Sequence, residues 1–358
     1  MIRVLVVEDS PVVRTLLVHL LESDPGIQVV STASNGEEAL EVVADKRPDI
    51  ITMDVHMPKL NGLDATRRIM ETHPTPIVVV SGSSTPRVAS LAFTAIEAGA
   101  LAVVERPRGI GHPDHEVSAA QLIQMVKLMA EVPVVRRWVR RGAHFAVSDS
   151  QQSATSALPP AIVKVIAIGA STGGPPVLQK TLAALPSDLP VPVLIVQHIS
   201  PGFSEGLTEW LRGTSKLPIR LASSGVHALP GHAYLAPDGL HLGIESDGRL
   251  RLTQEPPENG HRPSVAHLFR SVAKAFGAQA VGVLLTGMGT DGARELKLMK
   301  DNGAVTIAQD KISSVVHGMP GEAIRLGGAT LTVHADRLAA VLTELTNRNM
   351  GELHDRAN

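Results

Sequence analysis

Residues 166–176 read I-A-I-G-A-S-T-G-G-P-P, and this stretch joins an apolar run to a turn of small residues. The apolar run stops at Gly169, and Pro175 is a residue type that favours the first turn of a helix. The stretch therefore predicts a strand, a tight turn and a helix in succession. Ser171 lies in the turn, where it could be a nucleophile, a phosphate contact in a glycine-rich loop, or an ordinary turn residue.

Strand-like and helix-like patterns continue to alternate outward from this turn. Further strands are expected at residues 193–196, 281–285 and 304–307, and the strand before Ser171 is expected at 162–168. The segment L-H-L-G-I-E-S-D-G-R-L-R-L-T-Q, residues 240–254, predicts a hairpin around Asp247 and Gly248. This half of the chain is therefore predicted to be a parallel-sheet α/β domain with an antiparallel hairpin.

The first half shows the same alternation and predicts a second doubly wound α/β domain over residues 1–130. Its strands are expected at 2–7, 27–32, 50–53, 77–80 and 101–104, with helices at 12–21, 36–44 and 65–72. Residues 131–160 are rich in Ser, Gln and Pro and include a cluster of arginines, so they predict a solvated linker. The later domain is then expected to span residues 161–350.

Composition excludes several classes of protein. The 358-residue chain has no cysteine, which rules out disulfides, thiolate metal sites and a cysteine nucleophile. A net charge of −2 gives no electrostatic reason to expect a nucleic-acid partner. The N-terminus lacks the pattern of a signal peptide, and no apolar run approaches the roughly 20 residues of a membrane span. A cytoplasmic protein without membrane insertion is expected.

Acidic residues follow the predicted strands of the first half. Glu8 and Asp9 come after the first strand, and Asp54 comes after the third. Singly, each could simply cap the following helix. Together they predict a Mg²⁺ site at the carboxyl edge of the sheet, because converging carboxylates need a cation between them. Asp54 would then attack phosphorus, assisted by Ser81 and Arg106 beyond strands four and five.

These residues lie in stretches that resemble the receiver domain of two-component response regulators, which has a flavodoxin-like fold. The stretches are V-V-E-D-S-P (6–11), M-D-V-H-M-P-K-L-N-G-L-D (53–64) and V-V-V-S-G (78–82). The resemblance implies that Asp54 accepts phosphate from a histidine kinase, and that Asp9 and Asp54, assisted by Glu8, hold the metal. Arg106 stands where the family usually has lysine, which keeps the charge but changes its shape and reach.

Three residues of the second half fit a Ser–His–Asp arrangement. Residues 169–173 match G-x-S-x-G, whose small residues would let the backbone turn sharply and expose the Ser171 hydroxyl. His198 follows the next strand, and Asp291 follows the strand at 281–285 in a glycine-rich turn. Singly, the histidine could be a packing residue and the aspartate a cap. His261 and His317 are fallback candidates for the base, and the Met288 N–H is a candidate oxyanion donor.

Chain order separates this arrangement from other families. An α/β-hydrolase places its histidine last, whereas here the order is Ser171, His198, Asp291. A phosphate-binding P-loop needs Lys followed by Ser or Thr after its glycines, but Gly174 is followed by two prolines.

The second half resembles the catalytic domain of the chemotaxis protein-glutamate methylesterases, and the whole chain has that family's domain order. The matching stretches are I-G-A-S-T-G-G-P (168–175), Q-H-I-S-P-G-F (197–203), L-A-P-D-G (235–239), H-R-P-S-V (261–265) and L-L-T-G-M-G-T-D-G (284–292). The resemblance implies a triad of Ser171, His198 and Asp291 with Thr172 and Met288 nearby. It also implies no cofactor for the ester chemistry.

By the same resemblance, the substrates are glutamyl methyl esters, and also glutamines, of methyl-accepting chemotaxis receptors. A chemotaxis histidine kinase would phosphorylate the receiver and so relieve inhibition of the catalytic domain. Three alternatives are an esterase of this family that serves another two-component pathway, a non-enzymatic adaptor, and a DNA-binding response regulator. The adaptor would be expected to lose part of the triad, and the DNA-binding regulator would need a basic helix-turn-helix.

Overall fold

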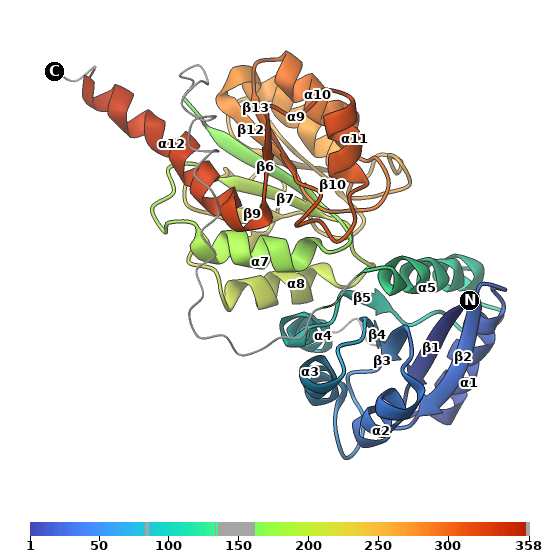
Figure 1. The fold of residues 1–358 in the computed structure, drawn as a ribbon. Coiled ribbons are helices and arrows are strands. Elements are labelled where there is room, and N and C mark those ends of the chain that lie inside the picture. Colours follow the sequence, from blue (N-terminus) through green and yellow to red (C-terminus); the bar gives the residue numbers. More distant parts are fainter. Residues whose placement is uncertain (83–85, 133, 135–161, 356–358) are drawn as a thin grey trace. The chain divides into compact units, whose positions relative to one another are not determined.

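The computed structural model describes residues 1–82, 86–132, 134 and 162–355 and divides the chain into two compact units, Met1–Phe145 and Ala146–Asn358. The linker expected at 131–160 falls almost wholly outside the described residues. Each unit is an α/β fold built around its own parallel sheet (Figure 1).

The first unit has a five-stranded parallel sheet in the order β2-β1-β3-β4-β5. Asn35 caps α2 by accepting hydrogen bonds from the N–H groups of Glu37 and Glu38. The five strands predicted for this unit are confirmed, each to within one or two residues. The elements are β1 (Ile2–Val7), α1 (Pro11–Glu22), β2 (Ile27–Ala33), α2 (Gly36–Lys46), β3 (Ile50–Met53), α3 (Gly62–Thr72), β4 (Ile77–Ser81), α4 (Pro86–Ala98), β5 (Ala102–Glu105) and α5 (His115–Ala130).

The second unit has a seven-stranded parallel sheet in the order β14-β13-β12-β6-β7-β9-β8, and the predicted hairpin forms a separate two-stranded antiparallel sheet. Helices α7 and α8 lie on one side of the large sheet and α9, α10 and α11 on the other (Figure 1). The elements are β6 (Val165–Ala170), α7 (Gly174–Ala184), β7 (Val193–Gln197), α8 (Ser204–Arg212), β8 (Ile219–Leu221), β9 (Ala233–Leu235), β10 (His241–Ile244), β11 (Leu250–Thr253), α9 (Val265–Phe276), β12 (Ala280–Leu284), α10 (Ala293–Asp301), β13 (Val305–Gln309), α11 (Met319–Arg325), β14 (Leu331–Val333) and α12 (Leu338–Asp355).

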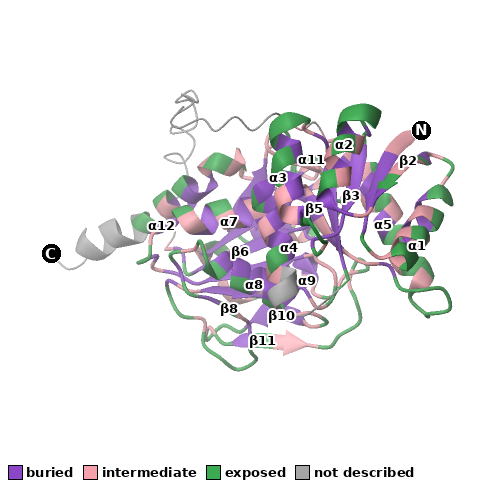
Figure 2. Ribbon diagram, turned by 90° about the horizontal axis from the view of Figure 1, so that it is seen from below, coloured by how far each residue is buried: buried purple, intermediate pink, exposed green. Residues whose placement is uncertain are grey.

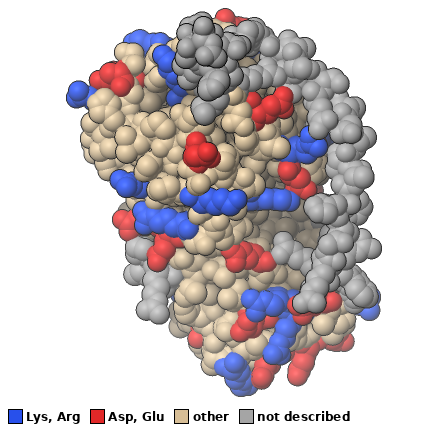
Figure 3. Space-filling view, turned by 90° about the vertical axis from the view of Figure 1, so that its left-hand side faces the viewer, with Lys and Arg blue, Asp and Glu red and all other residues tan. Residues whose placement is uncertain are grey.

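Both sheets are apolar on both faces, because helices cover each face. All residues of β6, β7 and β12 are buried, and the exposed residues lie mainly on the outer helix faces and loops (Figure 2). Acidic and basic side chains are interspersed on the surface in Figure 3, in keeping with the small net charge. None of the helices in the described part of the chain combines the length and apolar composition needed to cross a bilayer.

Candidate active site and phosphoacceptor site

The structure brings Ser171, His198 and Asp291 to the same edge of the large sheet. They follow β6, β7 and β12, and β6 pairs with β7 on one side and with β12 on the other. The chain therefore passes from β6 to β7 on one side, and β12 later pairs with β6 on its opposite side. In open α/β sheets, ligands bind beyond the carboxyl ends of the strands at such a topological switch point.

The turn that carries Ser171 is tied to two neighbouring strands. The Ser171 N–H donates to Thr286 O at 3.0 Å, and the Ser171 carbonyl accepts from Gln197 Nε2 at 2.7 Å. Gly173, the N-cap residue before α7, has φ of +77°, a conformation in which a side chain would be strained. The hydroxyl was expected to be exposed, but Ser171 is only 8% exposed because the adjoining loops pack closely around it.

Glycines permit this close packing. A Cβ atom on Gly287 would lie 2.6 Å from the Cβ of Ser171, and one on Gly174 would lie 2.2 Å from Gln197 Oε1. Gly169 makes room for a different residue, since a Cβ there would lie 2.2 Å from Cγ1 of Val265 at the start of α9. The glycines thus clear space for neighbouring loops rather than for solvent around the hydroxyl.

His198 and Asp291 form a buried pair. His198 Nε2 lies 2.9 Å from Asp291 Oδ2, and the side chains are 7% and 3% exposed. The other ring nitrogen, Nδ1, is buried and has no hydrogen-bond partner among the described residues. Nor does a hydrogen bond join it to Ser171 Oγ.

The start of α9 holds the Asp291 carboxylate. Oδ2 accepts from the Val265 N–H at 2.7 Å, while Oδ1 accepts from Ser264 Oγ at 2.9 Å and from Asn259 Nδ2 at 2.8 Å. Burial alone would raise the pKa of Asp291, but these donors and above all His198 hold it well below its usual range. Asp291 is therefore ionised and oriented.

Two backbone N–H groups near Ser171, those of Thr172 and Met288, donate no hydrogen bond to any residue that the structure describes. Thr286, which follows β12, connects the turn after β6 to the loop after β13. Its hydroxyl contacts Thr172 O at 3.0 Å and Val316 O at 3.1 Å. The position of the Thr172 peptide is therefore coupled to β12 and to the loop after β13.

Several residues of this site were not singled out from the sequence. Asn259, Ser264, Thr286 and Gln197 make the contacts above, and the Asn259-Gly260 dipeptide is a turn signal that could have drawn attention to one of them. Of the fallback histidines, His261 stacks on His198 with ring centroids 3.8 Å apart. His317 pairs through its backbone with Gly287, next to Met288.

The first unit gathers the predicted acidic residues at its own sheet edge. Oxygen atoms of Glu8, Asp9 and Asp54 all lie within 4.8 Å of one another. Burial and the neighbouring Asp54 raise the pKa of Glu8 to about 7, and burial also raises the pKa of Asp54. An oxygen-only set of ligands with unfavourably buried charges suits a hard divalent cation such as Mg²⁺.

Arg106 supplies the positive charge at this edge. Its Nη2 lies 3.1 Å from Glu8 Oε2 and 3.6 Å from Asp54 Oδ2. The guanidinium also packs over Gly82, where a Cβ would lie 2.6 Å from its Cζ atom. Ser81 ends β4 and is 1% exposed, and its carbonyl accepts from the Arg106 N–H at 2.8 Å. All five predicted residues therefore surround one site.

A second group of potential metal ligands, Glu255, Glu258 and His267, lies beside α9. Arg270 already pairs with both carboxylate oxygens of Glu258, at 2.5 and 2.7 Å. Because Arg270 already neutralises the Glu258 carboxylate, the group is an ion-pair network.

The folds and sites define a class of protein in which an α/β unit with a phosphoacceptor-type acidic site precedes an α/β unit with a serine-hydrolase-type arrangement. Comparison with known proteins identifies the family. Residues 166–342 match the CheB methylesterase family, and residues 4–112 match the response regulator receiver domain.

Individual relatives agree over nearly the whole chain. A protein-glutamate methylesterase/protein-glutamine glutaminase of Nitrosospira multiformis is 56% identical over 346 residues, covering 96% of this chain and 97% of the relative. One of Geobacter metallireducens is 56% identical over 350 residues, covering 96% and 99%. The crystal structure of the Thermotoga maritima CheB methylesterase catalytic domain matches with 36% identity and a TM-score of 0.50, covering 51% of this chain and 98% of that one.

The chain therefore belongs to the CheB methylesterase family and carries a response regulator receiver domain. The predicted family, α/β architecture and methylesterase class are confirmed.

Proposed function

We propose that the chain is a receiver-regulated serine hydrolase that removes methyl groups from glutamyl methyl esters of chemoreceptors. The observation that carries this proposal is that Ser171 lies at the same sheet edge as the buried His198–Asp291 pair, in which His198 Nε2 is 2.9 Å from Asp291 Oδ2. Beside them are the N–H groups of Thr172 and Met288, which have no acceptor among the described residues. The names of the relatives support the same substrate class and add glutamine deamidation.

In the proposed reaction, His198 Nδ1 takes the proton of Ser171 as its hydroxyl oxygen attacks the ester carbonyl carbon. Asp291 holds the other ring nitrogen and stabilises the imidazolium. The N–H groups of Thr172 and Met288 bind the oxyanion. The C–O bond to methanol breaks, His198 returns the proton to methanol, and water then hydrolyses the acyl-enzyme. For a glutamine, ammonia leaves instead of methanol.

Regulation is proposed to run through the receiver, residues 1–130, joined by a linker at 131–160 to the catalytic domain at 161–350. A chemotaxis histidine kinase would phosphorylate Asp54, with Mg²⁺ held by Glu8, Asp9 and Asp54. When bound, Mg²⁺ supplies charge neutralisation for phosphoryl transfer. Ser81 and Arg106 would contact the phosphoryl group. Phosphorylation would release inhibition of the catalytic domain.

The proposal is tested by methanol release from methylated receptors, with and without acetyl phosphate and Mg²⁺. Ser171→Ala should abolish release, while phosphodonor should raise the wild-type rate. Removing Mg²⁺ with a chelator should abolish the increase but leave the basal rate unchanged, because the proposed ester chemistry uses no metal. Release by Ser171→Ala near the wild-type rate would refute the nucleophile, and a basal rate lost on chelation would refute the metal-free mechanism.

A further inference from the structure

A tight turn between β11 and α9 lies against the His198–Asp291 pair. The Glu258 N–H donates to His261 O at 3.0 Å, and the His261 N–H donates to Glu258 O at 2.9 Å. Between them, Asn259 and Gly260 have φ of +52° and +81°. Positive φ at both central residues is the pattern of a type I′ turn, for which Asn-Gly is a preferred sequence.

Two residues of this turn contact the His198–Asp291 pair. Asn259 Nδ2 donates to Asp291 Oδ1 at 2.8 Å, and the His261 ring stacks on His198 with centroids 3.8 Å apart and planes at 9°. We propose that the Glu258–His261 turn is a positioning device, in which Asn259 fixes the rotation of the Asp291 carboxylate and His261 fixes the plane of the His198 ring. This inference rests on the proposed catalytic role of that pair.

The two contacts act on different degrees of freedom. Asp291 Oδ1 is occupied by Asn259 and Ser264, which turns Oδ2 toward His198. The flat stacking of His261 restricts rotation of the His198 ring about its side-chain bonds. Burial, and next the charge of His198, lower the pKa of His261 to about 4. The stacked ring is therefore neutral near pH 7 and adds no positive charge beside a protonated His198.

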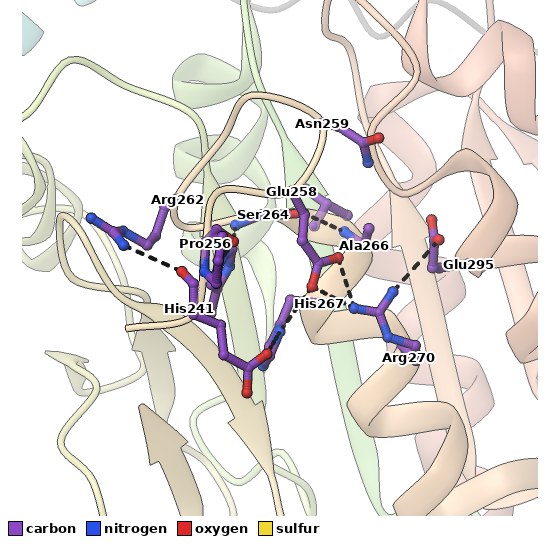
Figure 4. Close-up of polar contacts among 12 residues, drawn as sticks. His241, Pro256, Glu258, Asn259, Arg262, Ser264, Ala266, His267, Arg270 and Glu295 are labelled. Atoms are coloured by element: carbon purple, nitrogen blue, oxygen red, sulfur yellow. Dashed lines mark hydrogen bonds and ion pairs between the residues drawn. The ribbon is translucent and has the colours of Figure 1, made fainter. Parts of the chain in front are cut away.

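Glu258 anchors the turn to α9. Glu258 pairs with Arg270 and lies 3.3 Å from His267 Nδ1, and Arg270 also lies 3.8 Å from Glu295. Figure 4 shows Glu258 and Arg270 pointing toward one another, with Glu295 on the far side of the guanidinium.

The fully buried His241 joins both ends of the segment 256–264. Its Nε2 bonds Pro256 O at 3.1 Å and its Nδ1 accepts from the Ser264 N–H at 3.2 Å. Figure 4 shows these residues close together beside the hairpin. With both of its ends held, the segment can present a fixed turn to the active site.

Asn259→Gly removes the side-chain amide donor but keeps the turn, since glycine adopts positive φ without strain. In the full chain we expect kcat to fall about 10- to 100-fold with KM changed less than about twofold, as for a loss of orientation. Asn302→Gly is the matched control, because among the described residues that amide bonds Leu298 O alone, at the exposed end of α10. It should retain wild-type kcat.

A second readout does not depend on the receptor substrate. The rate at which a fluorophosphonate labels Ser171 reports activation of the hydroxyl, and Asn259→Gly should reduce it by a similar factor. If wild type were labelled but released no methanol, the proposed substrate would fail while the positioning role could still be judged. Wild-type labelling and kcat in Asn259→Gly, or a change confined to KM, would overturn the role of Asn259.

Two replacements of His261 distinguish the stacking of its ring from a chemical role of its ring nitrogens. His261→Phe keeps a flat ring, so kcat and labelling should stay within about threefold of wild type, whereas His261→Ala should lower both about tenfold or more. Equal losses in the two variants would show that the ring nitrogens matter, and wild-type rates in His261→Ala would show that the stack does not. Either result would overturn the positioning role of His261.

Discussion

Gly287 lies so close to Ser171 that no side chain fits between them. A Cβ atom built on Gly287 would lie 2.6 Å from the Cβ of Ser171 and 2.4 Å from the Sδ of Met319. The loop after β12 and the turn after β6 are thus in direct backbone contact, and this contact sets the distance between Ser171 and the Met288 N–H.

Gly287→Ala should therefore inactivate the enzyme without unfolding it. One added methyl group must displace the Ser171 turn, and a shift of about 1 Å at a nucleophile can lower kcat about 100-fold. Methanol release measures the rate, and circular dichroism checks the fold. Gly109→Ala is the control, since nothing lies within 4 Å of a Cβ there. A Gly287→Ala enzyme with wild-type kcat would contradict the importance of this contact.

Thr286 should be needed for its hydroxyl rather than for its shape. The fully buried hydroxyl accepts from the Val316 N–H at 2.9 Å and contacts Thr172 O at 3.0 Å. Thr286→Val leaves these groups unpaired, so we expect stability to fall by about 1–3 kcal/mol and kcat to fall about tenfold or more. Thr286→Ser keeps the hydroxyl and should retain most of the rate in the same assay. Equal rates in the two variants would argue against a role of the hydroxyl.

The sequence was informative where strands end and much less so where loops meet. Ser171, His198 and Asp291 each follow an apolar strand, and parallel strands bring their carboxyl ends to one edge, so their convergence could be predicted. The same reasoning predicted the cluster around Asp54. Strand order in the second unit could not be predicted, because β8, β9 and β14 are only three residues long and show no usable periodicity.

Contacts made by loops depend on distances that no spacing rule provides. Asn259 is 32 residues from Asp291 along the chain, and only the folded path of the β11–α9 segment brings its amide to the carboxylate. The burial of Ser171 was likewise missed, because small residues in a turn permit either exposure or close packing.

His261 should make the second unit less stable in acid. Its native pKa of about 4 lies below the ordinary value of 6.5, so between these pH values the unfolded chain binds the proton more readily. Stability should therefore fall as pH drops from 6.5 to 4, by at most about 3 kcal/mol. His261→Phe should flatten this dependence, whereas His227→Phe, at an exposed position, should not.

Denaturant unfolding followed by Trp210 fluorescence in a Trp138→Phe background would measure this, because Trp210 lies in α8 of the same unit. An unchanged pH dependence in His261→Phe would assign the acid sensitivity to other groups.

Arg106 should couple phosphorylation to activity. Burial raises the pKa of both Glu8 and Asp54, and the Arg106 guanidinium, 3.6 Å from Asp54 Oδ2, offsets part of that rise. In Arg106→Ala we expect acetyl phosphate still to phosphorylate the chain, but to give less than about a third of the wild-type increase in methanol release, because the phosphoryl group loses its charged partner. Arg106→Lys keeps the charge and should retain much of the increase. Arg108→Ala, which removes an exposed pair with Glu105, is the control. Full activation of Arg106→Ala at equal phosphorylation would show that the signal leaves Asp54 by another route.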